Sequence, residues 1–275
     1  MKMKDTFFSF LRFANYFKKV LVEDRKRLLQ RIITVFGLLV VFGAIISDSC
    51  YQHYMEALKM GIVRNEIDPA IDGLMPLFVF GLFIGCALSA SFIMEPMNSK
   101  TGRIYALMLP ATSFEKYFVR WFIYTIGYLV VYYLLFLLVD VMRVCVFSVI
   151  YPEIDIITFL NPYAEIVALR DDAPLGFIVS LYLLLQSIFV LGSSLWPKYA
   201  FLKTFTAYTI LGMAFSAFFA GIMNLFDRPG NSYIMPELSD DTLFLIATCG
   251  VMMVTLFFWW LAYKRFKEME VVNRW

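Results

Sequence analysis

The stretch LMPLFVFGLFIGCALSASFIM, residues 74–94, carries no charged side chain over 21 positions. The hydrocarbon core of a bilayer is about 30 Å thick, so a helix needs about 20 mostly apolar residues to cross it. The stretch therefore predicts a transmembrane helix. It lacks the alternation of polar and apolar residues that is typical of a strand in a membrane barrel.

The whole chain has the composition of a membrane protein. Hydrophobic residues make up 61% of its 275 residues and charged residues 17%, below the roughly 25% of an ordinary globular domain. The mean hydropathy is +0.72. We predict an all-α polytopic membrane protein with six transmembrane helices and an N-terminal interfacial amphipathic helix. The predicted spans are residues 32–50, 74–94, 121–139 with an extension to 150, 175–195, 205–226 and 243–263.

The distribution of basic residues predicts the orientation of the spans. Nineteen of the 24 Lys and Arg residues lie before the first span, in the second-to-third and fourth-to-fifth connections, or after the sixth span. The positive-inside rule places these segments in the cytoplasm. We therefore expect a multi-pass protein of the bacterial cytoplasmic (inner) membrane with both termini in the cytoplasm. The net charge of +2 gives no reason to expect a nucleic-acid partner.

The domain organisation follows from the same pattern. Residues 1–31 are expected to form a cytoplasmic interfacial helix and a basic linker, residues 32–263 the transmembrane domain, and residues 264–275 a cytoplasmic tail. In the leader, Phe7, Phe10 and Phe17 recur at helical spacing among basic residues. This pattern is typical of a helix that lies in the membrane interface. A leader without a defined pose is the alternative.

The sequence carries no catalytic constellation that we recognise. His53 is its one histidine, whereas a zinc protease of the H-E-x-x-H type needs two. The phosphate-binding pattern G-x-x-x-x-G-K-[ST] does not occur. We interpret the chain as a protein that is not an enzyme, and we expect no catalytic residue, metal or cofactor in it.

Two kinds of residue within the spans predict contacts between helices. Gly81, Gly85 and Ser89 in the second span follow the small-xxx-small spacing that lets helices approach closely, and so do Ala217 and Gly221 in the fifth. The spacing does not tell whether these residues pack within one chain or between two.

A charged pair lies at the far end of the third apolar run. Asp140 and Arg143 are three residues apart, so on a helix they share a face and can form an ion pair. We expect this pair near the outer end of the third span, because a charge at the bilayer centre is costly. A contact to substrate is the alternative.

The second-to-third connection, residues 95–120, reads EPMNSKTGRIYALMLPATSFEKYFVR. The apolar residues 104–109 interrupt a basic loop and predict a short helix that ends at Pro110. Thr112 or Ser113 can cap the next helix, with Glu115 in its first turn. A cytoplasmic helix that presents apolar and basic groups suits docking to a partner. A loop helix packed against its own bundle is the alternative.

This connection resembles the corresponding loop of permease subunits in bacterial type-two ATP-binding-cassette (ABC) exporters. The pattern is K-x-G-R…L-x-L-P-A-[ST]-x-x-E-K, and it comprises Lys100, Gly102, Arg103, Leu107, Leu109, Pro110, Ala111, Thr112, Glu115 and Lys116. The resemblance implies a docking contact with a separate cytoplasmic ABC ATPase subunit, which would bind ATP and magnesium. The expected docking residues are Lys100, Gly102, Arg103, Leu107, Leu109, Pro110, Glu115 and Lys116. The resemblance also implies a second permease copy or a paralogue as partner in a dimer.

The resemblance leaves one feature of the family open. Many of its members carry a re-entrant hairpin between the fifth and sixth spans, but residues 227–241 are short and polar here. Whether a hairpin exists near residues 220–241 therefore stays undecided.

Together, the residues and the resemblance predict the membrane-spanning subunit of an ATP-driven ABC exporter. It would form the substrate pathway and couple to the ATPase through the 95–120 loop. A stand-alone secondary transporter, or an integral-membrane enzyme or assembly factor, is the alternative. The first would need acidic residues within the membrane, and the second a polar site at one face.

Overall fold

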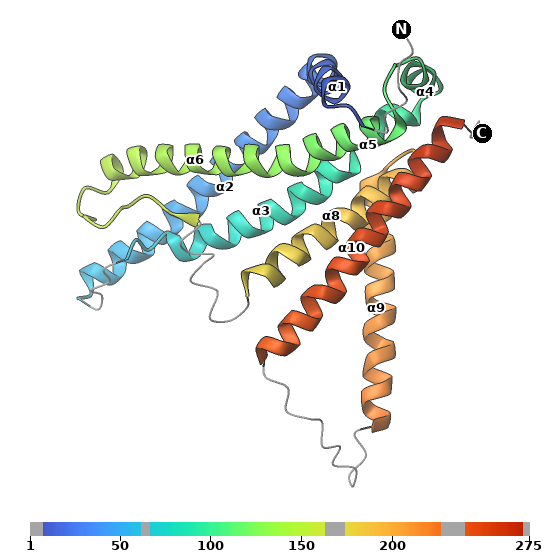
Figure 1. Cartoon of the computed structure of the whole chain (residues 1–275). Helices are drawn as coiled ribbons and strands as arrows, with labels where there is room; N and C mark the ends of the chain where they lie inside the picture. Colours follow the sequence, from blue (N-terminus) through green and yellow to red (C-terminus); the bar gives the residue numbers. More distant parts are fainter. Residues whose placement is uncertain (1–7, 62–66, 163–173, 227–239, 272–275) are drawn as a thin grey trace. The chain divides into compact units, whose positions relative to one another are not determined.

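The structure is a computed structural model, which describes residues 8–61, 67–162, 174–226 and 240–271 (Figure 1). All regular elements in these ranges are helices. Six of the helical stretches are long and apolar enough to cross a membrane. The predicted fold class, an all-α polytopic membrane protein, is therefore confirmed.

The chain folds as two compact units. The first comprises residues 1–89 and 111–172, and the second residues 90–110 and 173–275. The elements of the first unit are α1 (Phe10–Glu23), α2 (Arg25–Lys59), nearly all of α3 (Ile71–Ser91), α5 (Ser113–Phe122), the π-helical turn η2 (Ile123–Gly127) and α6 (Tyr128–Ile150). The last three follow one another without a break and form the third long apolar helix.

The core of the first unit is built by α2, α3 and α6, with Leu39, Phe78, Tyr132 and Phe136 among its buried side chains. Three small residues of α3 lie against three tyrosines at the same four-residue spacing on η2 and α6. The pairs are Gly81 with Tyr132, Gly85 with Tyr128, and Ser89 with Tyr124. A Cβ atom at either glycine would overlap the hydroxyl of its tyrosine. The stripe predicted in the second span therefore packs within the chain.

Polar groups between α3 and the third apolar helix find their hydrogen-bond partners within the protein, because lipid chains offer none. The Tyr128 hydroxyl donates to the carbonyl of Gly81 at 3.1 Å, and the Tyr132 hydroxyl donates to that of Phe78 at 2.9 Å. The Ser89 hydroxyl donates to the Tyr124 carbonyl at 2.7 Å. A buried hydroxyl without a partner is costly, so these bonds fix the register between α3 and α6.

The second unit holds the remaining helices, which are η1 (Glu95–Asn98), α4 (Lys100–Leu107), α8 (Leu175–Leu195), α9 (Ala200–Phe226) and α10 (Asp240–Val271). Helix α8 packs along α10, where the buried amide of Gln186 accepts a hydrogen bond from the Trp259 indole at 2.9 Å. Near its start α9 packs on α8, because Gly192 leaves room for the Thr204 side chain.

The remainder of α9 has a different environment. The side chains of residues 205–218 are nearly all exposed, and open space surrounds Gly221. In the described part of the chain, Ala217 and Gly221 therefore do not show the close packing that their spacing predicts. Most of the segment in which a re-entrant hairpin was considered, residues 220–241, lies outside the described residues.

Several helices, among them α2 and α10, are longer than the apolar runs that predicted them. Helix α2 begins at Arg25 and α10 continues to Val271, so the basic linker and part of the tail are helical. Lys, Arg and Gln are good helix formers, so the helices continue past the polar boundary. The break near the N-terminus falls at Asp24 instead, between α1 and α2.

The contact between α3 and α6 predicts a glycine requirement at position 85. We expect Gly85→Ala to lower the thermal unfolding midpoint of the purified protein, because overpacking a tight contact costs about 1–3 kcal/mol. Gly37→Ala is the matched control, since nothing lies within 4 Å of a Cβ atom there. Unfolding in detergent, followed by size-exclusion chromatography after heating, measures both. Equal midpoints for the two variants would contradict the close contact.

Candidate functional site

Helix α4 begins four residues earlier than the apolar stretch indicates. Ser99 is its N-cap, and the Ser99 hydroxyl accepts a hydrogen bond from the Gly102 amide at 3.0 Å. Such a cap satisfies one of the free N–H groups at a helix start. A Cβ atom at Gly102 would overlap the carbonyl oxygen of Pro96. Glycine at this position therefore lets α4 lie directly against η1.

One face of α4 is apolar and exposed. Ile104, Tyr105 and Met108 are 50%, 52% and 79% exposed, whereas Ala106 on the other face is buried. Among the predicted docking residues, Lys100 and Pro110 are exposed, and Arg103 and Leu109 are partly buried. The side chain of Leu107 lies outside the described residues.

The sequence pattern therefore missed part of this face. Of the two leucines in the predicted docking set, only the side chain of Leu109 is described, and it is partly buried, whereas Ile104, Tyr105 and Met108, which that set left out, are exposed. The missing information was the helix phase, which depends on where the helix starts. Recognising Ser99 as the cap would have placed these three side chains together, because residues three and four apart share a face.

The predicted cap of the following helix is present. The Thr112 hydroxyl accepts from the Glu115 amide at 3.2 Å, and Glu115 Oε2 accepts from the Thr112 amide at 3.0 Å. These reciprocal bonds are a capping box at the start of α5.

The second oxygen of the same carboxylate accepts hydrogen bonds at the N-terminus of another helix, α1. Glu115 Oε1 accepts from the Ser9 amide at 2.7 Å and from the Arg12 guanidinium at 3.1–3.2 Å. Ser9 is the N-cap residue of α1. A negative charge at a helix N-terminus is favourable because it faces the positive end of the helix dipole. One buried carboxylate thus holds the N-termini of α1 and α5 together.

This arrangement corrects two of the predicted docking residues. Glu115 is 0% exposed and Lys116 is 4% exposed, so neither presents its charge to a partner in this structure. The phase of α5 turns residues 115, 116, 119 and 120 inward. The predicted contact surface is therefore reduced to α4 and its neighbours in sequence.

The aromatic residues of α1 are divided between two environments. Phe13 packs on Phe118 with ring centroids 5.6 Å apart, and Phe17 packs on Phe122 at 6.0 Å. Phe10 is exposed, together with Leu11 and Val22, while Phe7 lies outside the described residues. Phe17, predicted to face the membrane interface, instead helps to attach α1 to α5. The leader contains aromatic residues around much of the helix, so periodicity alone did not show which face α5 would cover.

The predicted Asp140–Arg143 ion pair is part of a larger buried cluster. Arg143 Nε lies 2.8 Å from Asp140 Oδ1, and Nη1 lies 2.8 Å from Asp68 Oδ2. The guanidinium also donates to the Thr158 carbonyl at 2.6 Å and to the hydroxyl of Tyr51. The extra carboxylate comes from the segment before α3, 75 residues away from Arg143, so the spacing within one helix could not predict it.

Backbone groups complete the cluster around the two carboxylates. Asp68 accepts from the amides of Ala70 at 2.9 Å and Thr158 at 3.1 Å, and Asp140 accepts from the amide of Leu160 at 2.8 Å. The cluster thus joins α2, α6, the start of α3 and residues 151–160. Asp140 and Arg143 also border an otherwise apolar cavity of about 100 Å³ between α2, α3 and α6. Because these charges have several partners, we interpret the cluster as structural.

The double role of Glu115 predicts a large effect of its neutralisation. We expect Glu115→Gln to lower the unfolding midpoint and to release α1, because a buried carboxylate that pairs with Arg12 and two amides loses its charge. The mobility of a spin label at Leu11 measures the release. Glu23→Gln is the control, since Glu23 pairs with Lys19 at the surface at 3.6 Å. A label that moves equally in both variants would refute the contact.

The Arg143 cluster predicts that removing one charge destabilises the fold much more than removing all three. Arg143→Met should destabilise the fold by about 3–5 kcal/mol, because two carboxylates stay buried without their cation. Adding Asp68→Asn and Asp140→Asn should recover a large part of that loss. Arg265→Met removes an exposed pair with Glu268 and should cost under about 1 kcal/mol. Thermal unfolding in detergent compares the variants, and a triple variant no better than Arg143→Met would contradict this reading.

Known proteins give no further assignment for these residues. Comparisons with protein-family models, with curated proteins and with solved structures find no match to this chain. The function is therefore inferred from the residues themselves.

Proposed function

We propose that this protein is the membrane-spanning subunit of an ATP-driven exporter of the ABC type, and that α4 docks onto a separate ATPase subunit. The observation that carries the proposal is the exposed apolar face of α4, formed by Ile104, Tyr105 and Met108. The resemblance of residues 100–116 to the coupling loop of such permeases supports the same contact. Helix α4 would lie on the cytoplasmic side of the membrane, and the permease would act as a dimer of identical or related chains.

The position of α4 distinguishes its exposed residues from those of the spans. A helix of eight residues is about 12 Å long, which is too short to cross a bilayer. It lies between two long apolar helices in the sequence. An exposed apolar cluster outside a span is a common sign of a protein interface. Aromatic residues and Met are also enriched where protein interfaces are buried.

The attachment of α4 suits the transmission of a force. Ser99 caps the first turn of α4, Gly102 lets the helix lie directly against η1, and α4 also packs on α10. A partner that binds the apolar face would therefore act on a helix that packs against both η1 and α10. Nucleotide-driven movement of the ATPase would then reach α10, which is a span of the same unit. The permease would do no covalent chemistry and would hold no nucleotide.

The composition of the chain bears on the transported molecule. Aromatic residues make up 18% of the sequence, and the charges of the Arg143 cluster are used within the chain. A hydrophobic or amphipathic substrate, such as a lipid or a peptide, fits these spans better than an ion. A secondary transporter driven by protons or sodium would need a titratable group that is available to the pathway.

Substitution of Met108 tests the docking contact without disturbing a core. We expect Met108→Asp to weaken binding of the ATPase at least about 30-fold, because buried anchors of an interface contribute about 2 kcal/mol or more. The measurements are co-purification with the ATPase from native membranes and permease-dependent ATP turnover in proteoliposomes. Met60→Asp is the matched control, since Met60 is 70% exposed at the end of α2.

Two results would overturn the proposal. The first is that Met108→Asp retains the binding and turnover of the unmodified protein. The second is that no ATPase with a P-loop co-purifies with the native chain. Ion-gradient-driven uptake in the absence of ATP would favour a secondary transporter. Inactivity in both assays would favour a membrane enzyme or an assembly factor.

A further inference from the structure

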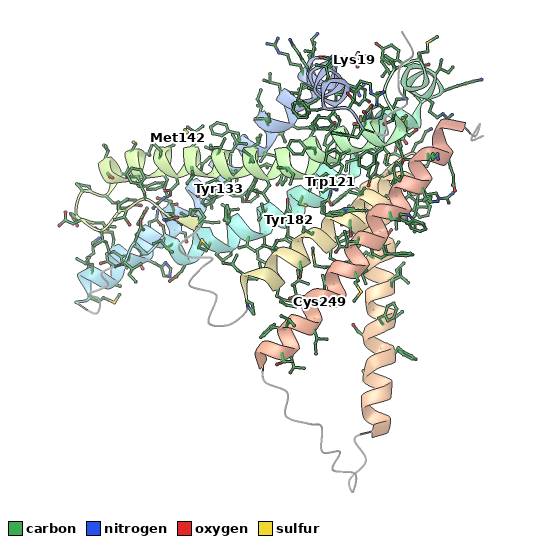
Figure 2. All side chains as sticks on the ribbon, viewed as in Figure 1. Lys19, Trp121, Tyr133, Met142, Tyr182 and Cys249 are labelled. Carbon is green, nitrogen blue, oxygen red and sulfur yellow. The ribbon has the colours of Figure 1, made fainter. Side chains whose placement is uncertain are left out.

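A group of exposed cations lies around the break between α1 and α2, two helices of the first unit that Figure 1 labels. Lys18, Arg25 and Lys26 are exposed, and within the described residues the structure records no ion pair or hydrogen bond for their side chains. Other basic residues nearby are engaged. Lys19, labelled on α1 in Figure 2, lies 3.6 Å from Glu23, and Arg27 lies 3.9 Å from Asp24. The three cations therefore present their charge outward.

Exposed apolar side chains share the faces that carry these cations. On α1, Leu11, Lys18 and Val22 follow one another at spacings of seven and four residues, which places them on one face. On α2, Leu29 and Ile33 follow Arg25 at four-residue intervals. All four apolar residues are exposed. The surface thus alternates apolar and basic groups from the leader into the first span.

We propose that Lys18, Arg25 and Lys26 form a binding surface for anionic lipid headgroups, with Leu11, Val22 and Leu29 inserted at the edge of the acyl region. The chemistry is complementary, because a phosphodiester headgroup offers a negative charge and oxygen acceptors to ammonium and guanidinium groups. Basic clusters next to a transmembrane helix attract anionic lipids in this way.

The position of the surface favours a lipid over a protein as its occupant. The apolar residues of the surface continue into those of α2, which is itself long and apolar enough to cross the membrane. A transmembrane helix in a bilayer has headgroups at its ends, so the cations just before the apolar run lie at headgroup depth. Long basic side chains can extend to the phosphates while their stems stay in apolar surroundings.

This surface is independent of the proposed transport function, because it requires only that α2 spans the membrane and that α1 lies at its surface. It also gives α1 a role beyond general membrane affinity. The aromatic side of α1, with Phe13 and Phe17, is occupied by α5. The opposite, basic side is then the part of the helix that binds anionic lipids in preference to neutral ones.

Quenching of a fluorophore next to the cations tests the proposal. The full chain, with its four native cysteines replaced by Ala, is labelled at Val22→Cys and reconstituted in phosphatidylcholine vesicles. Brominated phosphatidylglycerol or brominated phosphatidylcholine is then added at equal mole fraction. We expect the anionic lipid to associate at least about fivefold more strongly, the effect of a single basic residue near an anionic surface. The preference should fall as salt shortens the Debye length from about 10 Å to about 3 Å.

Charge-matched variants assign the effect to these residues. Lys18→Gln, Arg25→Gln and Lys26→Gln together should make the two lipids quench equally. Lys59→Gln, Lys198→Gln and Lys267→Gln remove the same charge from other exposed positions and should leave the preference intact. The proposal fails if the labelled protein shows no preference, if the first variant keeps it, or if both variants lose it equally. Absence of quenching by either lipid would also overturn it. The salt series needs no charge variant, so it stands even if the triple substitution prevents folding.

Discussion

The constraint on which this structure depends is that polar groups in hydrocarbon must find their partners within the protein. The backbone meets it by forming helices throughout the spans. Many side-chain hydroxyls follow the same rule. The hydroxyls of Ser180, Ser193 and Thr255 donate to carbonyls three or four residues earlier in their own helices, at 2.7–2.9 Å. Where a hydroxyl reaches another helix, as with Tyr128 on Gly81, it also sets the register of the two helices.

The same constraint explains which parts of the fold the sequence predicts. The length and apolarity of a span are demanded by the bilayer alone, so each of the six spans could be recognised from a single stretch of residues. Helix ends depend on propensity and capping, so the basic residues before Ile32 did not mark the start of α2 at Arg25. The partners of Gly81 and Gly85 could not be predicted, because a tyrosine that fills a glycine notch looks like any other tyrosine in a sequence.

At the site, too, the sequence predicted the contacts within one helical turn but not those between distant parts of the chain. The capping box of Thr112 and Glu115 is contained in four residues, and a cap at Thr112 or Ser113 with Glu115 in the first turn was predicted. The contact of Glu115 with Ser9 joins residues 106 positions apart, and nothing in the spacing indicates it. The Asp140–Arg143 pair likewise follows from one helical turn, whereas the role of Asp68 depends on how α3 and α6 come together. Sequence patterns thus identified the charged residues Glu115 and Arg143 and their partners within one helical turn, but not the partners that come from distant parts of the chain.

The buried charges of this protein act within the chain, and this affects where its intermolecular contacts can be. Glu115 and Arg143 each have several partners, and a buried charge engaged in this way has little capacity left for another molecule. Contacts to other molecules must then use groups that folding leaves exposed. On α4 these are apolar side chains, on a helix that Ser99 caps and that Gly102 allows to lie against η1. At the break after α1 they are cations beside apolar residues. An aqueous protein surface suits the first set because it hides apolar area from water, and a lipid headgroup layer suits the second because it offers anionic and apolar groups at adjacent depths.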